Sequence, residues 1–311
     1  MAITDNKKIM IKVCKYYFVD GLSQKEISAR LSISRPQISR ILSYAKSENI
    51  VSIKINDPYE KESELERTIA DKFNLSDVVV INTEGDDEDT FNKFAAGAAE
   101  QIEAYIPNGS TIGVMSGRTL SAVVKKVSHL DRRNITVVPL VGGDGFNGSD
   151  WHANAIASNL AQKSGGKFFI LNAPVIVGNE NTAKIMKEEP SIREILDMGA
   201  QCDVALLGVG NIDEKSTSGQ ASQLKTEEID YLNDLGAVAS SCISYVDISG
   251  AIIESKINER LIGQPITNLK KAKTIAIAMG KSKITSIKAV LNTGYVDVLF
   301  TNLDTAKKII E

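Results

Sequence analysis

The most informative polar residues of this 311-residue chain lie at the start of a predicted helix near the N-terminus. Ser34 and Gln37 have the spacing of a capping box, and Pro36 suits a first helical turn, where N–H groups lack intrahelical partners. In the second helix of a helix-turn-helix, such side chains face base edges in the major groove. Arginine can bind guanine with two hydrogen bonds, and glutamine can bind adenine in the same way. The expected DNA-binding residues are Ser34, Arg35, Gln37, Ser39 and Arg40.

A second capping box precedes this helix and completes the helix-turn-helix pattern. Ser23 and Glu26 start a short helix, and Ser32-Ile33 leaves room only for a tight corner. Residues 1–56 hold ten lysines and arginines against four acids, a charge of +6, whereas the rest of the chain carries −9. This asymmetry favours a polyanionic partner for the N-terminus, here double-stranded DNA. The alternatives are a solvated basic face and a helical hairpin that binds protein.

Small and hydroxyl-bearing residues follow several predicted strands and have the chemistry of an anion site. Residues 116–119 open a helix, whose first backbone N–H groups attract anions, and their arginine adds a fork for phosphate. Ligands of parallel sheets bind at the carboxyl ends of the strands, so turns after neighbouring strands should share one pocket. The alternative is a tight turn for each glycine and a solvated helix start for the lysine. The expected effector-binding residues are Ser116, Gly117, Arg118, Thr119, Gly142, Gly143, Asp144, Gly208, Gly210 and Lys283.

Other chemistry has little support in the sequence. The three cysteines have no metal-ligand spacing, and their sparse number fits a reducing cytoplasm. His129 and His152 have no visible carboxylate partner, so we expect no enzyme, no metal and no cofactor. A polar N-terminus and the lack of an apolar run of about 20 residues argue against secretion and membrane insertion.

Apolar runs alternate with helical patterns after residue 77 and predict a parallel sheet covered on both faces. Residues 237–262 carry denser strand signals, which indicate a hairpin insertion. The predicted strands are 78–81, 111–115, 135–140, 168–171, 204–207, 274–278 and 296–300. The predicted helices among them are 88–105, 118–128, 152–163, 282–292 and 303–310.

The predicted fold class is α/β: an N-terminal helix-turn-helix domain precedes a larger Rossmann-like parallel α/β effector domain. Residues 51–55 alternate between apolar and polar side chains and predict a short strand. We expect the helix-turn-helix domain at 1–56, a linker helix at 57–74 and the effector domain at 75–311.

The linker helix carries Leu65, Ile69 and Phe73 at a spacing of four, which makes it a candidate pairing surface. The effector domain is the alternative surface. One helix-turn-helix reads only a half-site, so we expect a homodimer or homotetramer on a palindromic operator.

The whole chain resembles SorC/DeoR-type sugar-responsive bacterial regulators. The resemblance runs in order through residues 22–42, 115–119, 140–143, 203–210, 292–299 and 305–306. It implies a winged helix-turn-helix, with the strand at 51–55 as the wing, joined to an effector domain similar to sugar-phosphate isomerases and deaminases. It places residues 116–119 on the family's phosphate loop, Gly142 and Gly143 on its second ligand loop, and Lys283 on its phosphate-facing lysine.

The chain departs from the family pattern at two places. Some relatives carry a lysine before the Gly-Gly pair that can form an imine with an aldehyde, and this chain has Val141 there. Family members often have Gly-Gly where this chain has Met279-Gly280. We therefore expect a non-covalent effector.

These patterns together predict a cytoplasmic regulator of a carbohydrate-utilisation operon. Its operator affinity is expected to depend on a sugar or, preferably, a phosphorylated sugar. The alternative is an enzyme similar to sugar-phosphate isomerases or deaminases with a vestigial N-terminal domain. Such an enzyme needs a carboxylate and a histidine positioned for proton transfer, and the sequence offers no convincing pair.

Overall fold

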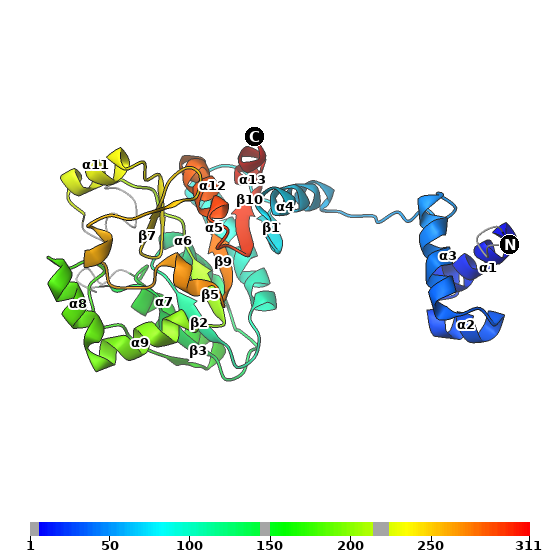
Figure 1. Cartoon of the computed structure of the whole chain (residues 1–311), viewed down its shortest axis with the longest axis horizontal. Helices are drawn as coiled ribbons and strands as arrows, with labels where there is room; N and C mark the ends of the chain where they lie inside the picture. The colour runs from blue at the N-terminus through cyan, green and yellow to red at the C-terminus, as the bar shows by residue number, and fades with distance from the viewer. Residues whose placement is uncertain (1–5, 144–149, 214–223) are drawn as a thin grey trace. The chain divides into compact units, whose positions relative to one another are not determined.

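The structure is a computed structural model and describes residues 6–143, 150–213 and 224–311. The chain forms two compact units, Met1–Pro58 and Tyr59–Glu311 (Figure 1). Each has a buried apolar core of its own. The helix expected as a linker, α4 (Glu60–Phe73), belongs to the second unit.

The N-terminal unit is a helix-turn-helix, as predicted. It consists of α1 (Lys7–Cys14), a π-helical turn η2 (Lys15–Val19), α2 (Gln24–Leu31) and α3 (Arg35–Ser47). Both predicted capping boxes form, and Ser32 makes the corner with a left-handed conformation at φ 53°. The helices share a core of Met10, Val13, Cys14, Ile27, Ile38, Ile41, Leu42 and Ala45.

The predicted wing strand is wrong. Residues 52–57 lie outside helices and strands, and Ile53 and Ile55 are 58% and 81% exposed. A strand needs a partner for its backbone N–H and C=O groups, and the described part of this unit contains no second strand. Alternation of apolar and polar residues is therefore not sufficient here.

The second unit is built on a parallel sheet with the strand order β1-β10-β9-β5-β2-β3-β4. All of its pairings are parallel. Each strand predicted after residue 77 overlaps an observed strand, but the prediction at 168–171 overlaps only at Phe168. The strands are β1 (Asp77–Ile81), β2 (Thr111–Val114), β3 (Thr136–Pro139), β4 (Lys167–Phe168), β5 (Val204–Leu207), β9 (Lys273–Ile277) and β10 (Val298–Asn302).

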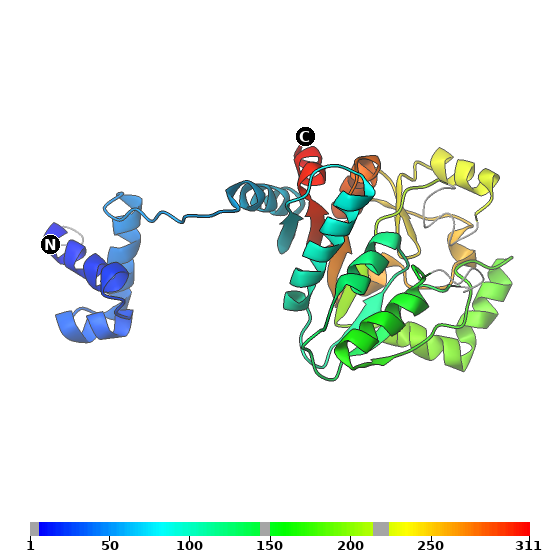
Figure 2. The ribbon, with the colours of Figure 1, turned by 180° about the vertical axis from the view of Figure 1, so that it is seen from behind.

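Helices cover both faces of this sheet (Figures 1 and 2). In β1, Val79 and Ile81 pack with α5 (Glu88–Gln101), α6 (Arg118–Lys126) and α7 (Ala153–Ser164). The alternate residues Val78 and Val80 pack with α4, α12 (Ile284–Asn292) and α13 (Leu303–Ile310). The alternation places one apolar layer on each face, as a doubly wound sheet requires.

The pairing surface predicted on α4 is used inside the chain. Ile69 is fully buried, and Leu65 and Phe73 pack against the same core as β1 and α13. The spacing correctly predicted an amphipathic helix, but the apolar face covers the sheet and is not left for a second copy.

Among the described residues, three α-helices were not predicted: α8 (Glu180–Glu188), α9 (Pro190–Ala200) and α11 (Thr226–Asp234). The predicted hairpin insertion is confirmed as an antiparallel sheet of β6 (Ala239–Ser241), β7 (Ser244–Val246) and β8 (Ile252–Ile253). In the described residues, no helix combines the length and apolar character needed to span a membrane.

Candidate functional site

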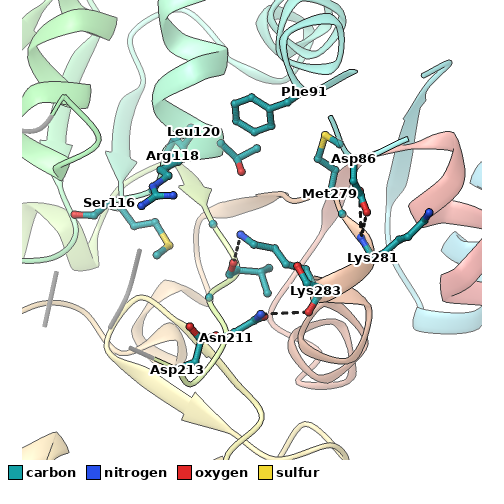
Figure 3. A pocket seen from close by; sticks show the side chains of 18 of the residues that line it. Asp86, Phe91, Ser116, Arg118, Leu120, Asn211, Asp213, Met279, Lys281 and Lys283 are labelled. Carbon is teal, nitrogen blue, oxygen red and sulfur yellow. Dashed lines mark hydrogen bonds between the residues drawn. The ribbon is translucent and has the colours of Figure 1, made fainter. Parts of the chain in front are cut away.

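A cavity of about 810 Å³ lies at the carboxyl ends of the sheet strands. Its walls are the turns after β2, β5 and β9 and the loop between β1 and α5 (Figure 3). Because β9, β5 and β2 are neighbours in the sheet, segments about 70 to 100 residues apart in sequence meet here. The volume is in the range of sites that enclose small organic ligands.

Most of the predicted effector residues line this cavity. They are Ser116, Gly117, Arg118, Thr119, Gly208, Gly210 and Lys283. Ser116 and Thr119 are buried, whereas Arg118 is exposed at the start of α6. Helix α6 begins at Arg118, so the first-turn N–H groups of this helix have no intrahelical acceptor.

Two groups of the predicted phosphate turn also have structural roles. The Gly117 N–H donates to the carbonyl oxygen of Trp151 at 2.9 Å. The Ser116 hydroxyl oxygen accepts the N–H of Ala153, the first residue of α7, at 3.1 Å. The Ser116 O–H can still donate, but the Gly117 N–H is not available to an anion in this arrangement.

Lys283 supplies a cation on the opposite wall. Its Nζ donates to the carbonyl oxygen of Val209 at 2.8 Å, which holds the side chain against the turn after β5. Burial lowers the pKa of Lys283 below the usual value, the Arg118 guanidinium lowers it further, and Asp213 opposes the shift. A phosphate between Arg118 and Lys283 would relieve the repulsion of these two cations.

Gly142 and Gly143 do not join this group. Neither glycine is among the described lining residues, and Asp144 lies outside the described residues. A Cβ on Gly142 would lie 2.4 Å from the carbonyl oxygen of Pro174 and 2.7 Å from that of Ala173. The absence of a side chain thus permits a close backbone approach, as predicted, but toward residues 173–174 and not toward the cavity.

Sequence reasoning missed an acidic wall. Asp86, Asp87 and Glu88 line the cavity from the β1–α5 loop, residues 82–87, and the start of α5. The Asp87 carboxylate accepts the Thr90 N–H at 2.7 Å and caps α5, which lowers its pKa. The acidic run was visible in the sequence, but its strand is separated from β9 by β10, and the strand order could not be predicted.

The predicted DNA-binding residues lie together on the first turns of α3. Ser34, Arg35, Ser39 and Arg40 are exposed, and Ile38 between them is buried. Gln37 is half-buried, and its Oε1 accepts the Ser34 N–H at 3.1 Å and the Ser34 O–H at 2.9 Å. This capping bond occupies the oxygen that a bidentate adenine contact needs, so this arrangement does not support that contact.

The described residues offer little support for metal or acid–base chemistry. They contain no cluster of three metal-ligating side chains. His129 is exposed, and His152 is buried with its ring 4.2 Å from that of Trp151. Neither histidine lines the cavity.

Comparison with known proteins extends this picture over the whole chain. A family model described as a putative sugar-binding domain matches residues 57–311. The chain is 27% identical over 308 residues to the deoxyribonucleoside regulator of Bacillus subtilis, with 98% of each chain covered. It is 25% identical over 315 residues to the sorbitol operon regulator of Klebsiella pneumoniae, with 100% of each covered.

Solved structures show the same fold. The full-length sorbitol operon regulator of Klebsiella pneumoniae superposes with a TM-score of 0.75 at 24% identity. The match covers 99% of each chain, so it includes the helix-turn-helix and the α/β unit.

Proposed function

The chain belongs to the SorC/DeoR-type family of transcriptional regulators with a putative sugar-binding domain, and we propose that its effector is a phosphorylated sugar or sugar alcohol. The effector binds in the cavity at the carboxyl ends of the strands. Its binding changes the affinity of the N-terminal unit for an operator that controls carbohydrate use.

The pair of cations across the cavity carries this proposal. Arg118 enters from the start of α6 and Lys283 from the start of α12, and burial together with the Arg118 guanidinium lowers the pKa of Lys283. A phosphate dianion accepts hydrogen bonds from both, from the Ser116 and Thr119 hydroxyls and from the first turn of α6. An unphosphorylated sugar lacks this anion and is the second choice.

The other side of the cavity suits hydroxyl groups. Asp86 and Glu88 present carboxylates, which are acceptors only. Hydroxyls donate to such groups, so a phosphorylated polyol satisfies both walls. Gly142 and Gly143 are left out of this proposed site because they lie outside the cavity lining.

The proposed target of the N-terminal unit is double-stranded DNA, with Arg35 and Arg40 as the principal contacts. A single unit reads only a short half-site, so the proposed regulator is a homodimer or homotetramer on a palindromic operator. Since the target is DNA, the proposed location is the cytoplasm.

An enzyme is the less favoured alternative. Isomerases and deaminases of sugar phosphates move protons with positioned acids and bases. The cavity has carboxylates but no histidine among its described lining residues. The named relatives are regulators, which favours binding without turnover.

A thermal-shift screen of phosphorylated and free sugars tests this function. A ligand at 100 times its Kd stabilises the folded state by about 2.7 kcal/mol, which raises the melting temperature measurably. We expect phosphorylated polyols to raise the melting temperature of the unmodified protein but not that of an Arg118→Ala/Lys283→Ala variant. A shift of equal size from the matching free sugar would contradict the phosphate assignment.

A further inference from the structure

One carboxylate of the acidic wall, that of Asp86, accepts a backbone N–H from the turn that carries Lys283. The two oxygens of Asp86 lie 3.1 and 3.3 Å from the backbone nitrogen of Lys281, which donates to them (Figure 3). Both residues line the cavity, and Lys281 precedes Lys283 by two positions in the sequence. Asp86 therefore places a negative charge beside the backbone N–H of Lys281.

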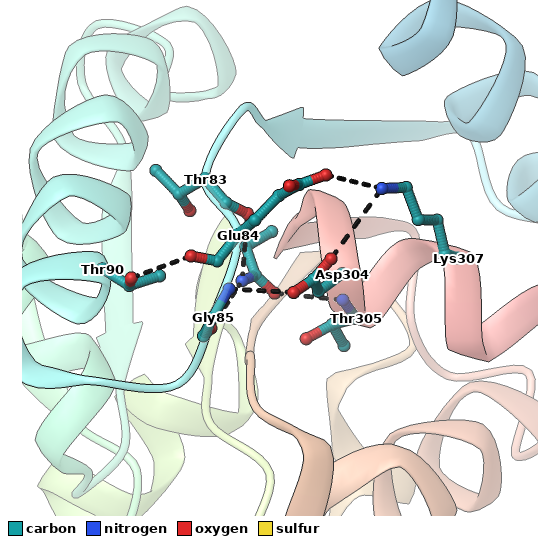
Figure 4. Close-up of polar contacts among 8 residues, drawn as sticks. Thr83, Glu84, Gly85, Thr90, Asp304, Thr305 and Lys307 are labelled. Atoms are coloured by element: carbon teal, nitrogen blue, oxygen red, sulfur yellow. Dashed lines mark hydrogen bonds and ion pairs between the residues drawn. The ribbon is translucent and has the colours of Figure 1, made fainter.

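Hydrogen bonds and an ion pair fix the two residues before Asp86 (Figure 4). The preceding residue, Gly85, donates its N–H to Asp304 of α13 at 2.8 Å. The Glu84 carboxylate pairs with Lys307 at 2.6 Å, and its carbonyl oxygen accepts the Thr90 hydroxyl at 3.0 Å. The backbone of the loop is thus tied to α13 and α5 at the two residues before Asp86.

The same helix also holds the partner of Asp86. Thr305, the residue after Asp304, accepts the N–H of Gly280 at 2.9 Å, and Gly280 directly precedes Lys281. Consecutive residues of α13 therefore position both halves of the Asp86–Lys281 contact. The Asp86 side chain itself is exposed.

We propose that Asp86 is a specificity-determining residue that limits the effector to a single anionic group. This inference rests on the proposed function, in which one phosphate binds between Arg118 and Lys283. A second phosphate directed toward Lys281 would meet the Asp86 carboxylate, and like charges in contact repel each other. The far end of the effector is consequently uncharged and hydroxyl-bearing, and its hydroxyls donate to Asp86. Sugar bisphosphates are rejected.

Titration of the full chain with inorganic phosphate, followed by amide NMR, tests this assignment without knowledge of the natural effector. In the unmodified protein we expect the amide signals of Thr119 and Leu120 to shift and saturate while that of Lys281 does not respond. In Asp86→Asn, the Lys281 amide should respond as well, because the amide keeps the size of the side chain and removes its charge. Binding at Lys281 should strengthen by at least about tenfold.

Asp87→Asn is the matched control. It removes one negative charge from the same wall and still caps α5, since asparagine is a good N-cap. Phosphate should leave its Lys281 amide unaffected. Asp86→Ala, which also removes the acceptor, provides a second variant with the same expectation as Asp86→Asn.

The outcomes separate this inference from the proposed function. A Lys281 amide that responds to phosphate in the unmodified protein, or in Asp87→Asn as strongly as in Asp86→Asn, overturns the role of Asp86 and leaves the phosphate site intact. If the Lys281 amide responds to phosphate in neither Asp86→Asn nor Asp86→Ala, the proposed role of Asp86 is also overturned. If phosphate shifts the amide signals of neither Thr119 nor Leu120, the proposed phosphate site is wrong, and the inference about Asp86 is wrong with it.

Discussion

The Nζ of Lys283 lies 2.8 Å from the carbonyl oxygen of Val209, so the turn after β5 orients the charge that begins α12. A buried carbonyl is a weaker partner for an ammonium than a phosphate, because charge-assisted bonds to anions are roughly twice as strong. The contact therefore holds Lys283 toward the cavity and leaves it able to bind an anion.

Removal of both cavity cations should abolish the response to effector. We expect Arg118→Ala/Lys283→Ala to bind its operator normally without effector but to show none of the about 5–150-fold change that typical allosteric coupling produces. Fluorescence anisotropy on a labelled operator, with and without the sugar phosphate identified by thermal shift, measures this. Lys288→Ala is the control, since Lys288 is also on α12 but does not line the cavity. A normal response in the double variant would place the effector elsewhere.

The affinity for phosphate should fall with rising pH because burial and Arg118 lower the pKa of Lys283. The folded protein loses this proton at a lower pH than a solvated lysine does, and a bound dianion favours the protonated form. Binding therefore takes up a proton, and affinity declines as pH rises through the pKa of free Lys283. Calorimetry with inorganic phosphate between about pH 8 and 10, where phosphate is already a dianion, measures the decline.

Two variants identify the group that titrates. Lys283→Arg should flatten the decline, since arginine stays charged over this range. Arg118→Ala should raise the pKa of Lys283 in the ligand-free protein, which side-chain ¹⁵N NMR detects directly. An unchanged pKa in Arg118→Ala would show that the two cations do not interact.

The sequence was a good guide where a signal is local. Three of its signals are short-range patterns: the capping boxes at Ser23 and Ser34, the apolar runs of the strands, and the glycine-rich turn before Arg118. Parallel sheets place strand ends on one edge by geometry, so the turns after β2, β5 and β9 could be grouped without coordinates.

The failures come from long-range partners. Asp86 contacts Lys281 across 195 residues, and nothing local distinguishes it from the other acids before α5. Gly142 is explained only by the backbone of Ala173 and Pro174. Ile53 and Ile55 alternate as a strand does, but the described residues of their unit offer no strand to pair with.

On α3, the arginines and Gln37 should give different results. Arg35→Ala or Arg40→Ala should weaken operator binding by about 1–3 kcal/mol each if the side chain contacts a base, without loss of thermal stability, because both are exposed. Gln37→Ala removes the capping bonds to Ser34, so it should destabilise the N-terminal unit by about 0.5–2 kcal/mol. Anisotropy and thermal melts of the three variants separate the effects. Unchanged operator affinity in both arginine variants would exclude α3 as the recognition helix.

The Gly-Gly pair offers a test of structural against ligand-binding roles. Gly142→Ala places a methyl group 2.4 Å from the Pro174 carbonyl oxygen, and backbone on both sides prevents an easy shift. We expect a loss of about 1–3 kcal/mol or more in the free energy of unfolding, as for other overpacked sites. Gly143→Ala meets only the His152 ring at 3.4 Å and should change stability by less than about 1 kcal/mol. Urea denaturation compares the two variants, and phosphate titration at 25 °C should give the same affinity for both as for the unmodified protein, since neither glycine lines the cavity. If Gly143→Ala is stable but binds phosphate more weakly, the Gly142–Gly143 pair is part of the effector site after all.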